Sequence, residues 1–288
     1  SSFLDNIAAA MIGGIVAKHV FDDRVHIGYI AAIVAASNAG GAGSVVGDTT
    51  TTMMWIDGVS PLDVLHAYVA SFVALAIVSI PASIAQQKYQ PIQARADASV
   101  SVDWVRMLIV VLILVTAIGS NVAANLYAPH LLDLMPVIGI GVWAAIIITA
   151  VLRKPDWGIV SSSLKGTLFL LCLVMSASLM PVESLPVASW QSTMGLGFVS
   201  AVFDNIPLTA LALAQGGYDW GMLAFAVGFG GSMMWFGSSA GVAITNIFPD
   251  AKSVWKWVTQ GWFVIVGYVV GFLVLYLTLG WHPHATHN

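Results

Sequence analysis

The stretch SNAGGAGSVVGDTTTT, residues 37–52, lies in a strongly apolar part of the chain, and its glycines would break a helix running through it. A second stretch, GFGGSMMWFGSSAG at 228–241, has the same design: a double glycine, a short gap, another glycine and then small hydroxyl residues. Each follows an Asp-Asn pair in an apolar setting, in SSFLDNIAAA (1–10) and SAVFDNIPLTA (200–210). Irregular backbone at membrane depth is tolerated only where it lines a protected cavity. The duplicated pattern therefore predicts a secondary transporter built from inverted repeats.

The composition supports a membrane location. Hydrophobic residues make up 58% of the chain, charged residues only 8%, and the mean hydropathy is +0.88, whereas soluble domains carry about 25% charge. Basic residues are too sparse for nucleic-acid binding. The single cysteine, Cys172, lies in an apolar segment, which excludes a disulfide framework and a cysteine metal site.

The fold class predicted from these patterns is an all-α polytopic membrane protein with inverted repeats, re-entrant hairpins and two glycine-broken helices. A bilayer-spanning helix needs about 20 apolar residues. On this criterion we expect helices at 5–21, 26–56 (broken at 40–48), 62–84, 104–126, 135–152, 158–181, 189–203 with 206–216, 219–248 (broken) and 255–280.

The domain organisation follows from these spans. Residues 1–84 would form the end of the first repeat, 85–103 a cytoplasmic loop between repeats, and 104–288 the second repeat with its scaffold helices, the hairpin 189–216 and the last helix. The first repeat begins abruptly at its Asp-Asn pair, whereas a full helix precedes the second pair. We therefore expect the chain to be shortened at its N-terminus, either as a truncated sequence or as a natural product that has lost its opening helices.

The basic residues predict the orientation. If 189–216 returns to the side it entered, all ten fall on or near one side of the membrane: Lys18, Arg24, Lys88, Arg95, Arg106, Arg153, Lys154, Lys165, Lys252 and Lys256. The positive-inside rule makes that side the cytoplasm. The prediction is a multi-pass protein of the cell's inner (plasma) membrane with hairpins on opposite faces and a non-cytoplasmic C-terminus.

Three intramembrane carboxylates, those of Asp5, Asp48 and Asp204, are the chief functional candidates, because an acid at a helix centre costs roughly 2.5–3.5 kcal/mol on insertion scales. The alternative is that they only cap helices, since Asp and Asn are favoured N-caps. The two interpretations are compatible, because a capping residue at a hairpin tip also points into the central cavity.

The helix breaks predict the site itself. Unwinding frees backbone carbonyls that can coordinate a cation, and the built-in acids favour a cation or protons over a dianion. The predicted ion-binding residues, expected to converge near the bilayer midplane, are Asp5, Asn6, Asn38, Gly40, Gly41, Gly47, Asp48, Thr49, Thr50, Asp204, Asn205, Gly230, Gly231, Gly237, Ser238 and Ser239. Ser238 takes the place that Asp48 holds after the first break, so the cavity should be more acidic on the side of the first repeat.

An enzyme embedded in the membrane is the rival class. A protease there would need a paired Ser/His or Asp/Asp geometry on continuous helices, and the sequence offers no such pair, nor a nucleotide motif, a nucleophile elbow or zinc-ligand spacing. We therefore expect a transporter that is not an enzyme, with no cofactor other than the coupling ions Na+ and H+.

The motif-bearing segments resemble a known group. SNAGGAGSVVGDTTTTMMWI (37–56) is similar to the signature of NhaD-type sodium/proton antiporters, FLDNIAAAM and VFDNIPLTAL resemble their hairpin tips, and GGSMMWFGSSAGVA resembles their second broken helix. Gly43 and Val45 depart from the signature, which has Trp and Pro there. The group belongs to the ion transporter superfamily, with the citrate transporters, arsenite exporters and divalent-anion/sodium symporters. The resemblance implies a homodimer with scaffold helices at its interface and an elevator-type transport domain.

The resemblance also bears on the substrate. The dicarboxylate branch has Ser-Asn-Thr at its hairpin tips, where this chain has Asp5-Asn6-Ile7 and Asp204-Asn205-Ile206, which favours the cation branch. We expect Na+ (or Li+) to exchange for H+, with Asp5, Asp48 and Asp204 as the residues that alternate between proton and cation. Cation-coupled uptake of a carboxylate such as citrate is the alternative, and arsenite export is the third.

Overall fold

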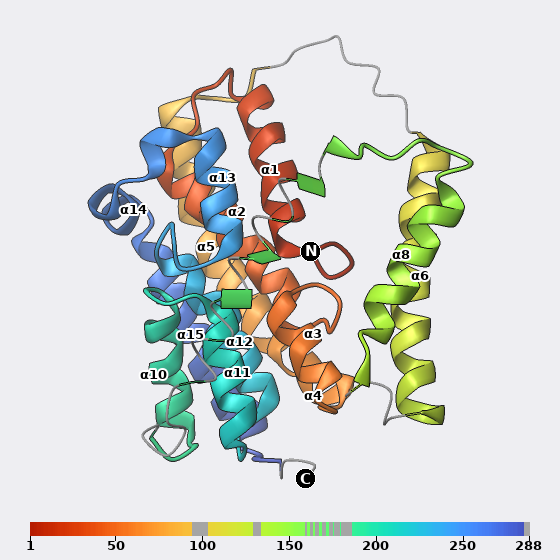
Figure 1. The fold of residues 1–288 in the computed structure, drawn as a ribbon. Helices are drawn as coiled ribbons and strands as arrows, with labels where there is room; N and C mark the ends of the chain where they lie inside the picture. Colours follow the sequence, from red (N-terminus) through yellow and green to blue (C-terminus); the bar gives the residue numbers. More distant parts are fainter. Residues whose placement is uncertain are drawn as a thin grey trace. The chain divides into compact units, whose positions relative to one another are not determined.

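The computed structural model describes residues 1–93, 103–128, 134–158 and 186–284, with a few isolated residues between 160 and 179. Within these residues the chain consists of helices joined by turns, and no strand occurs (Figure 1). The chain divides into two compact units, one of Ser1–Arg95 with Leu170–Asn288 and the other of Ala96–Phe169. The first unit contains all the predicted site residues.

The helices of the first unit come from both ends of the chain. Its N-terminal half contains α1 (Asn6–Val20), α2 (Ile27–Ala42), α3 (Thr49–Ile56), α4 (Pro61–Leu65) and α5 (Ala67–Tyr89). Its C-terminal half contains α10 (Trp190–Ser200), α11 (Asn205–Gln215), α12 (Trp220–Gly230), η2 (Gly231–Met233), α13 (Ser239–Ile247), η3 (Pro249–Ala251), α14 (Val254–Gln260) and α15 (Trp262–Leu279). In the second unit, α6 (Trp104–Tyr127) packs against α8 (Val137–Thr149).

Three helices in the described part of the chain are long and apolar enough to cross a membrane: Pro61–Tyr89, Trp104–Ala124 and Trp262–Leu279. Large apolar side chains such as Phe72 and Leu277 lie exposed on their outer faces. Such faces suit a lipid environment, in which helices satisfy their own backbone hydrogen bonds. The protein is an all-α polytopic membrane protein, as predicted.

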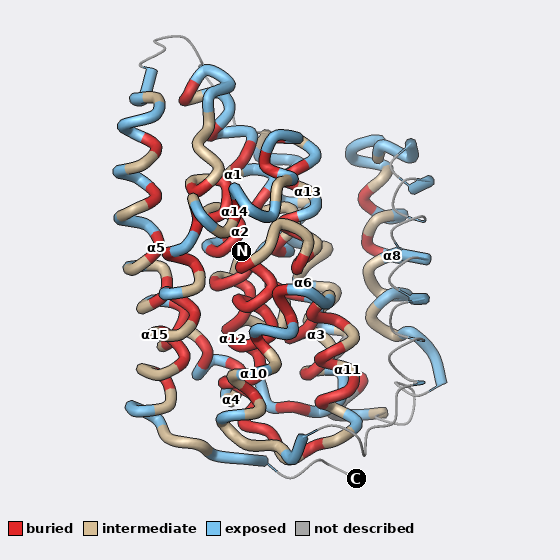
Figure 2. The backbone as a smooth tube through the Cα atoms, turned by 90° about the vertical axis from the view of Figure 1, so that its left-hand side faces the viewer, coloured by how far each residue is buried: buried red, intermediate tan, exposed pale blue. Residues whose placement is uncertain are grey.

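Equivalent helices in the two halves of the first unit have equivalent neighbours. Helix α1 packs against α13 while α11 packs against α3, and α2 packs against α5 while α12 packs against α15. The central helices α2 and α12 also contact each other, and their residues form the buried centre seen in Figure 2. This is the contact pattern expected of a duplicated unit, and the inverted repeat remains a prediction that it supports.

Both predicted helix breaks are present, although the first begins later than expected. Helix α2 runs through Gly40 and Gly41 to Ala42, and α3 begins only at Thr49. A Cβ atom on Gly41 would lie 2.7 Å from the carbonyl oxygen of Gly47. The double glycine therefore does not unwind the helix; it lets the chain that follows fold back against the helix end.

Two other predicted elements differ from the structure. The last helix, predicted as continuous over 255–280, is interrupted at Gly261, where α14 ends and α15 begins. Glycine weakens a helix interior, and a Cβ there would lie 3.0 Å from that of Ala31 on α2. The predicted loop at 85–103 begins later than expected, because α5 continues to Tyr89. Its residues 94–102 lie outside the described residues, as does most of the predicted helix at 158–181.

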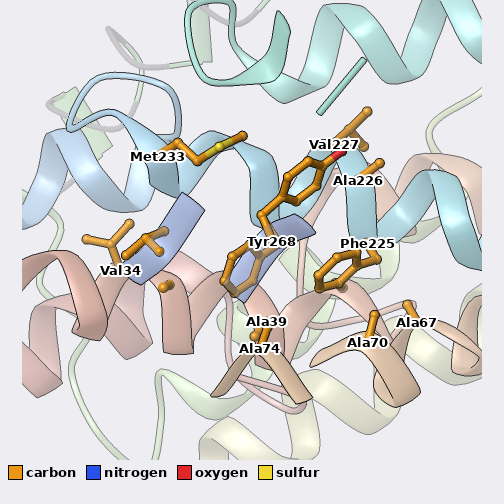
Figure 3. Close-up of a cluster of buried hydrophobic side chains, with 14 of the residues drawn as sticks. Val34, Ala39, Ala67, Ala70, Ala74, Phe225, Ala226, Val227, Met233 and Tyr268 are labelled. Carbon is orange, nitrogen blue, oxygen red and sulfur yellow. The ribbon is translucent and has the colours of Figure 1, made fainter. Parts of the chain in front are cut away.

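Small residues and stacked aromatic rings fill the centre of the unit. Figure 3 shows alanines of α2 and α5 beside Phe225 and Tyr268, whose rings stack 5.8 Å apart at an interplanar angle of 9°. The fully buried Tyr268 donates a hydrogen bond of 2.7 Å from its hydroxyl to the carbonyl oxygen of Met194. This bond ties α15 to α10, the first arm of the helical pair whose second arm, α11, is capped by Asp204.

Gly197→Ala is expected to lower the free energy of unfolding by about 2 kcal/mol, as overpacked cores typically do. The added Cβ would overlap the hydroxyl of Tyr268, so the ring would have to move and its bond to Met194 would break. Thermal unfolding of the purified protein in detergent measures the effect. Gly195→Ala on the same helix is the control, because its Cβ would meet nothing within 4 Å; equal melting temperatures for the two variants would contradict the prediction.

Candidate functional site

Four helix N-termini of the first unit are each capped by a predicted site residue. Asp5 Oδ2 accepts a hydrogen bond from the Ile7 amide at 3.1 Å, and Asp204 Oδ1 accepts one from the Ile206 amide at 3.0 Å. At the breaks, Asp48 caps α3 and Ser238 caps α13, through the amides of Thr50 and Gly241 respectively. The capping role is therefore real, and it places these side chains at the ends of the half-helices.

A buried network centred on Asn38, one turn before the first break, reaches the second break. Asn38 is fully buried on α2, and its Oδ1 accepts a hydrogen bond from Asn6 Nδ2 at 3.1 Å. Its Nδ2 donates to Ser232 Oγ at 2.9 Å and to Ser238 Oγ at 3.1 Å. One amide thereby links α1, α2, η2 and the N-terminus of α13.

Asp48 differs from these residues because part of its carboxylate has no partner. The residue is only 3% exposed, yet Oδ2 makes no hydrogen bond of standard geometry, and neither does the buried hydroxyl of Thr50, which lies beside the carboxylate. Buried polar atoms are almost always hydrogen-bonded, so exceptions call for an explanation. Thr51 and Thr52 cannot supply one, since their hydroxyls donate to the carbonyls of Ser44 and Val45 at 2.6 and 2.8 Å.

The other two acids act on Asp48 through their charge. The carboxylates of Asp5 and Asp204 both repel that of Asp48, although Asp5 is exposed and Asp204 half-buried. Among the residues that the structure describes, no three carboxylate, imidazole or thiol groups form a set that could hold a metal ion. The three acids thus share one electrostatic environment, with Asp48 as its buried member.

The remaining predicted ion-binding residues differ in how far they are buried. Most are buried around the breaks: Asn6, Gly41, Gly47, Asn205, Gly230, Gly231 and Gly237. Gly40 and Ser239 are half-buried, whereas Thr49 is exposed, because it opens the first turn of α3 on the side away from the core. The structure therefore gives Thr49 no place in the buried network.

The structure adds residues that the sequence reasoning missed. Ser232, one residue past the double glycine, holds Asn38, and its small hydroxyl in the second motif was the available signal. The carbonyl of Gly40, expected to be free for a cation, accepts hydrogen bonds from Ser2 Oγ at 2.9 Å and from the Tyr68 hydroxyl at 3.3 Å. Ser1 Oγ likewise donates to the carbonyl of Ser37.

An open cavity of about 860 Å³ lies elsewhere, at the turn between α1 and α2 and beside α14. Its charged lining comes from Lys18, Asp23, Arg24, Asp250 and Lys256. No predicted ion-binding residue lines this cavity, so it is separate from the candidate site at Asp48.

Comparisons with known proteins point to one group. The chain is 27% identical over 94% of its length to sodium/proton antiporter 1 of Arabidopsis thaliana, and 26% identical over 95% to sodium/proton antiporter 2 of the same plant. It is also 26% identical over 95% of its length to the Na(+)/H(+) antiporter NhaD of Alkalimonas amylolytica. The chain is therefore a homologue of sodium/proton antiporters, including the NhaD type, which confirms the resemblance seen in its motifs.

The matches cover unequal parts of these relatives. The chain spans about half of the first, 52%, and 72% and 66% of the other two. No family model matches the chain, and no solved structure matches it significantly.

Proposed function

We propose that this chain, a homologue of sodium/proton antiporters, forms the ion-binding core of a membrane transporter that exchanges Na+ (or Li+) for H+. The observation that carries the proposal is the buried Asp48 at a helix break, with one carboxylate oxygen free of any partner. A proton or a desolvated cation can each satisfy that oxygen, but both cannot do so together. Competition for one carboxylate is the simplest basis for exchange.

The charge around Asp48 favours a cation over an anionic substrate. Asp5 and Asp204 add negative charge, and the segments 1–10, 37–52, 200–210 and 228–241 contain no lysine or arginine. A carboxylate substrate would meet uncompensated repulsion, whereas a cation would be attracted. Transport of citrate or arsenite is therefore kept only as an alternative to the proposed exchange.

Each group has a distinct part in the proposed mechanism. Asp48 holds the proton or the cation, and the Thr50 hydroxyl, buried beside the carboxylate, is the neighbouring neutral ligand. The Asn38 network fixes α2 against α1 and the second break, while Asp5 and Asp204 raise the local cation concentration. We further propose that the duplicated halves work as inverted repeats in a homodimer with an elevator-type movement.

The orientation proposed is a plasma-membrane protein with a non-cytoplasmic C-terminus. Lys18, Arg24 and Lys256, far apart in the sequence, line one cavity at the same end of the unit. Basic residues gathered at one end support the cytoplasmic assignment of that end under the positive-inside rule.

A flux assay tests the exchange. Everted vesicles containing the full-length protein are given a pH gradient, and a Na+ pulse is then added while a fluorescent probe reports the gradient. We expect the pulse to dissipate the gradient, and Li+ to do the same. A gradient untouched by Na+ or Li+ while labelled citrate accumulates would show that the antiport assignment is wrong.

A further inference from the structure

We infer that Gly228 determines the room available for the ion beside Asp48, and so acts as a specificity-determining residue of the site. The inference rests on the proposed function, because it concerns the same carboxylate. It arises from a comparison of the two helix breaks, which share one backbone design but carry different side chains.

The two breaks correspond residue by residue. Gly40, Gly41, Gly47 and Asp48 have the same spacing as Gly230, Gly231, Gly237 and Ser238. The local geometry agrees as well. A Cβ on Gly41 would lie 2.7 Å from Gly47 O and 3.0 Å from Asp48 Cβ, and one on Gly231 would lie 2.6 Å from Gly237 O and 3.1 Å from Ser238 Cβ.

This correspondence pairs Asn38 with Gly228, each two positions before its double glycine. Asn38 reaches across to the capping residue of the opposite break, since its Nδ2 donates to Ser238 Oγ at 3.1 Å. Gly228 faces the capping residue of the other break, because a Cβ there would lie 3.4 Å from Asp48 Oδ2. The side-chain amide of Asn38 makes the first of these two contacts. Gly228 has no side chain with which to make the second.

The missing side chain accounts for the unpartnered oxygen of Asp48. At the second break, Ser238 has a hydrogen-bond partner in Asn38. At the first break, position 228 supplies no partner, and Asp48 Oδ2 stays buried without a hydrogen bond. Gly228 lies in the last turn of α12, where its backbone is helical and another residue would favour the helix more. Its value here is the space that it leaves next to the carboxylate.

A methyl group at position 228 would fill that space without disturbing the fold. The added Cβ would lie 3.4 Å from Asp48 Oδ2 and 3.6 Å from Ala42 Cβ, which are ordinary van der Waals contacts. An ion bound to Oδ2, or the water that accompanies it, would then meet an apolar wall. Li+ is smaller than Na+ and needs less room, so Na+ should be affected more.

The experiment compares Gly228→Ala with the wild type in the full-length protein. Thermal unfolding of the purified protein is followed as NaCl or LiCl is raised, with choline chloride holding ionic strength constant, because a ligand bound only to the folded state stabilises it. We expect the Na+ concentration that produces a fixed rise in melting temperature to increase about tenfold or more, the range for one added carbon in a binding pocket, and the corresponding Li+ concentration to increase less. Without either ion, the variant should melt at or above the wild-type temperature.

Two further variants separate the possible outcomes. Gly195→Ala, whose Cβ would meet nothing within 4 Å, is the matched control and should leave both ions unaffected. Gly228→Ser adds a hydroxyl to the same Cβ, and it should recover part of the Na+ affinity by offering a ligand oxygen. Wild-type responses to both ions in Gly228→Ala would overturn the inference, and so would failure of that variant to fold, since the inference requires the methyl to fit.

Failure of the proposed function would look different. If the wild-type protein itself showed no stabilisation by Na+ or Li+ beyond that by choline, the ion site at Asp48 would be wrong. If the wild type responded and Asp48→Asn did not, a normal response in Gly228→Ala would remove only the role of Gly228.

Discussion

Asp48→Asn is expected to reduce Na+/H+ exchange by at least about 100-fold, the loss that follows when one member of a buried charge interaction is removed. The amide cannot carry the negative charge that the proposed exchange requires. It can still cap α3, because Asn is as good an N-cap as Asp, so the variant should insert and fold. Exchange rates in everted vesicles, normalised to the amount of folded protein, give the measurement.

Ser238→Ala is the matched control for this prediction, because Ser238 occupies the corresponding position after the second break. It loses its bond with Asn38 and its cap of Gly241 but leaves Asp48 intact. We expect a reduction of exchange smaller than that of Asp48→Asn. Exchange impaired as strongly by Ser238→Ala as by Asp48→Asn would contradict the asymmetric site.

Asn38→Leu is expected to lower the free energy of unfolding by about 3 kcal/mol or more, because buried polar groups left without partners each cost roughly 1–3 kcal/mol. Leucine has the same branched side-chain shape, with methyl groups in place of the amide oxygen and nitrogen, so most of the loss would come from the unpaired Asn6, Ser232 and Ser238. Denaturation of the purified protein without Na+ measures it.

Ser232→Ala serves as the comparison for Asn38→Leu, since it removes a single bond to the same amide. It should cost less than half as much. Equal melting temperatures for Asn38→Leu and the wild type would show that the Asn38 network does not hold the breaks together.

Local chemistry made the helix breaks and the helix caps predictable. Irregular backbone is tolerated at membrane depth only in a protected cavity, and a carboxylate is costly there, so the motif at 37–52 and its partner at 228–241 could be placed from the sequence. The Asp-Asn pairs marked helix starts because Asp is a strong N-cap, and the structure begins α1 at Asn6 and α11 at Asn205.

Contacts between distant segments could not be predicted in the same way. Asn38 bonds to Ser232 and Ser238, which lie in the other half of the chain, and no local pattern reports such pairs. The role of Gly41 depends on the chain folding back to Gly47, so its position in the motif suggested unwinding where the structure has close packing. Gly228 was part of a quoted motif, but only the three-dimensional position of Asp48 reveals what its missing side chain leaves open.

The most direct test of the central claim is proton release on ion binding. Purified full-length protein in a weakly buffered solution is mixed with NaCl, and a pH-sensitive dye reports the protons released, with choline chloride as the ionic-strength control. The account predicts that Na+ releases protons from the wild type and none from Asp48→Asn. Na+ binding without proton release in the wild type, or equal release from Asp48→Asn, would contradict it.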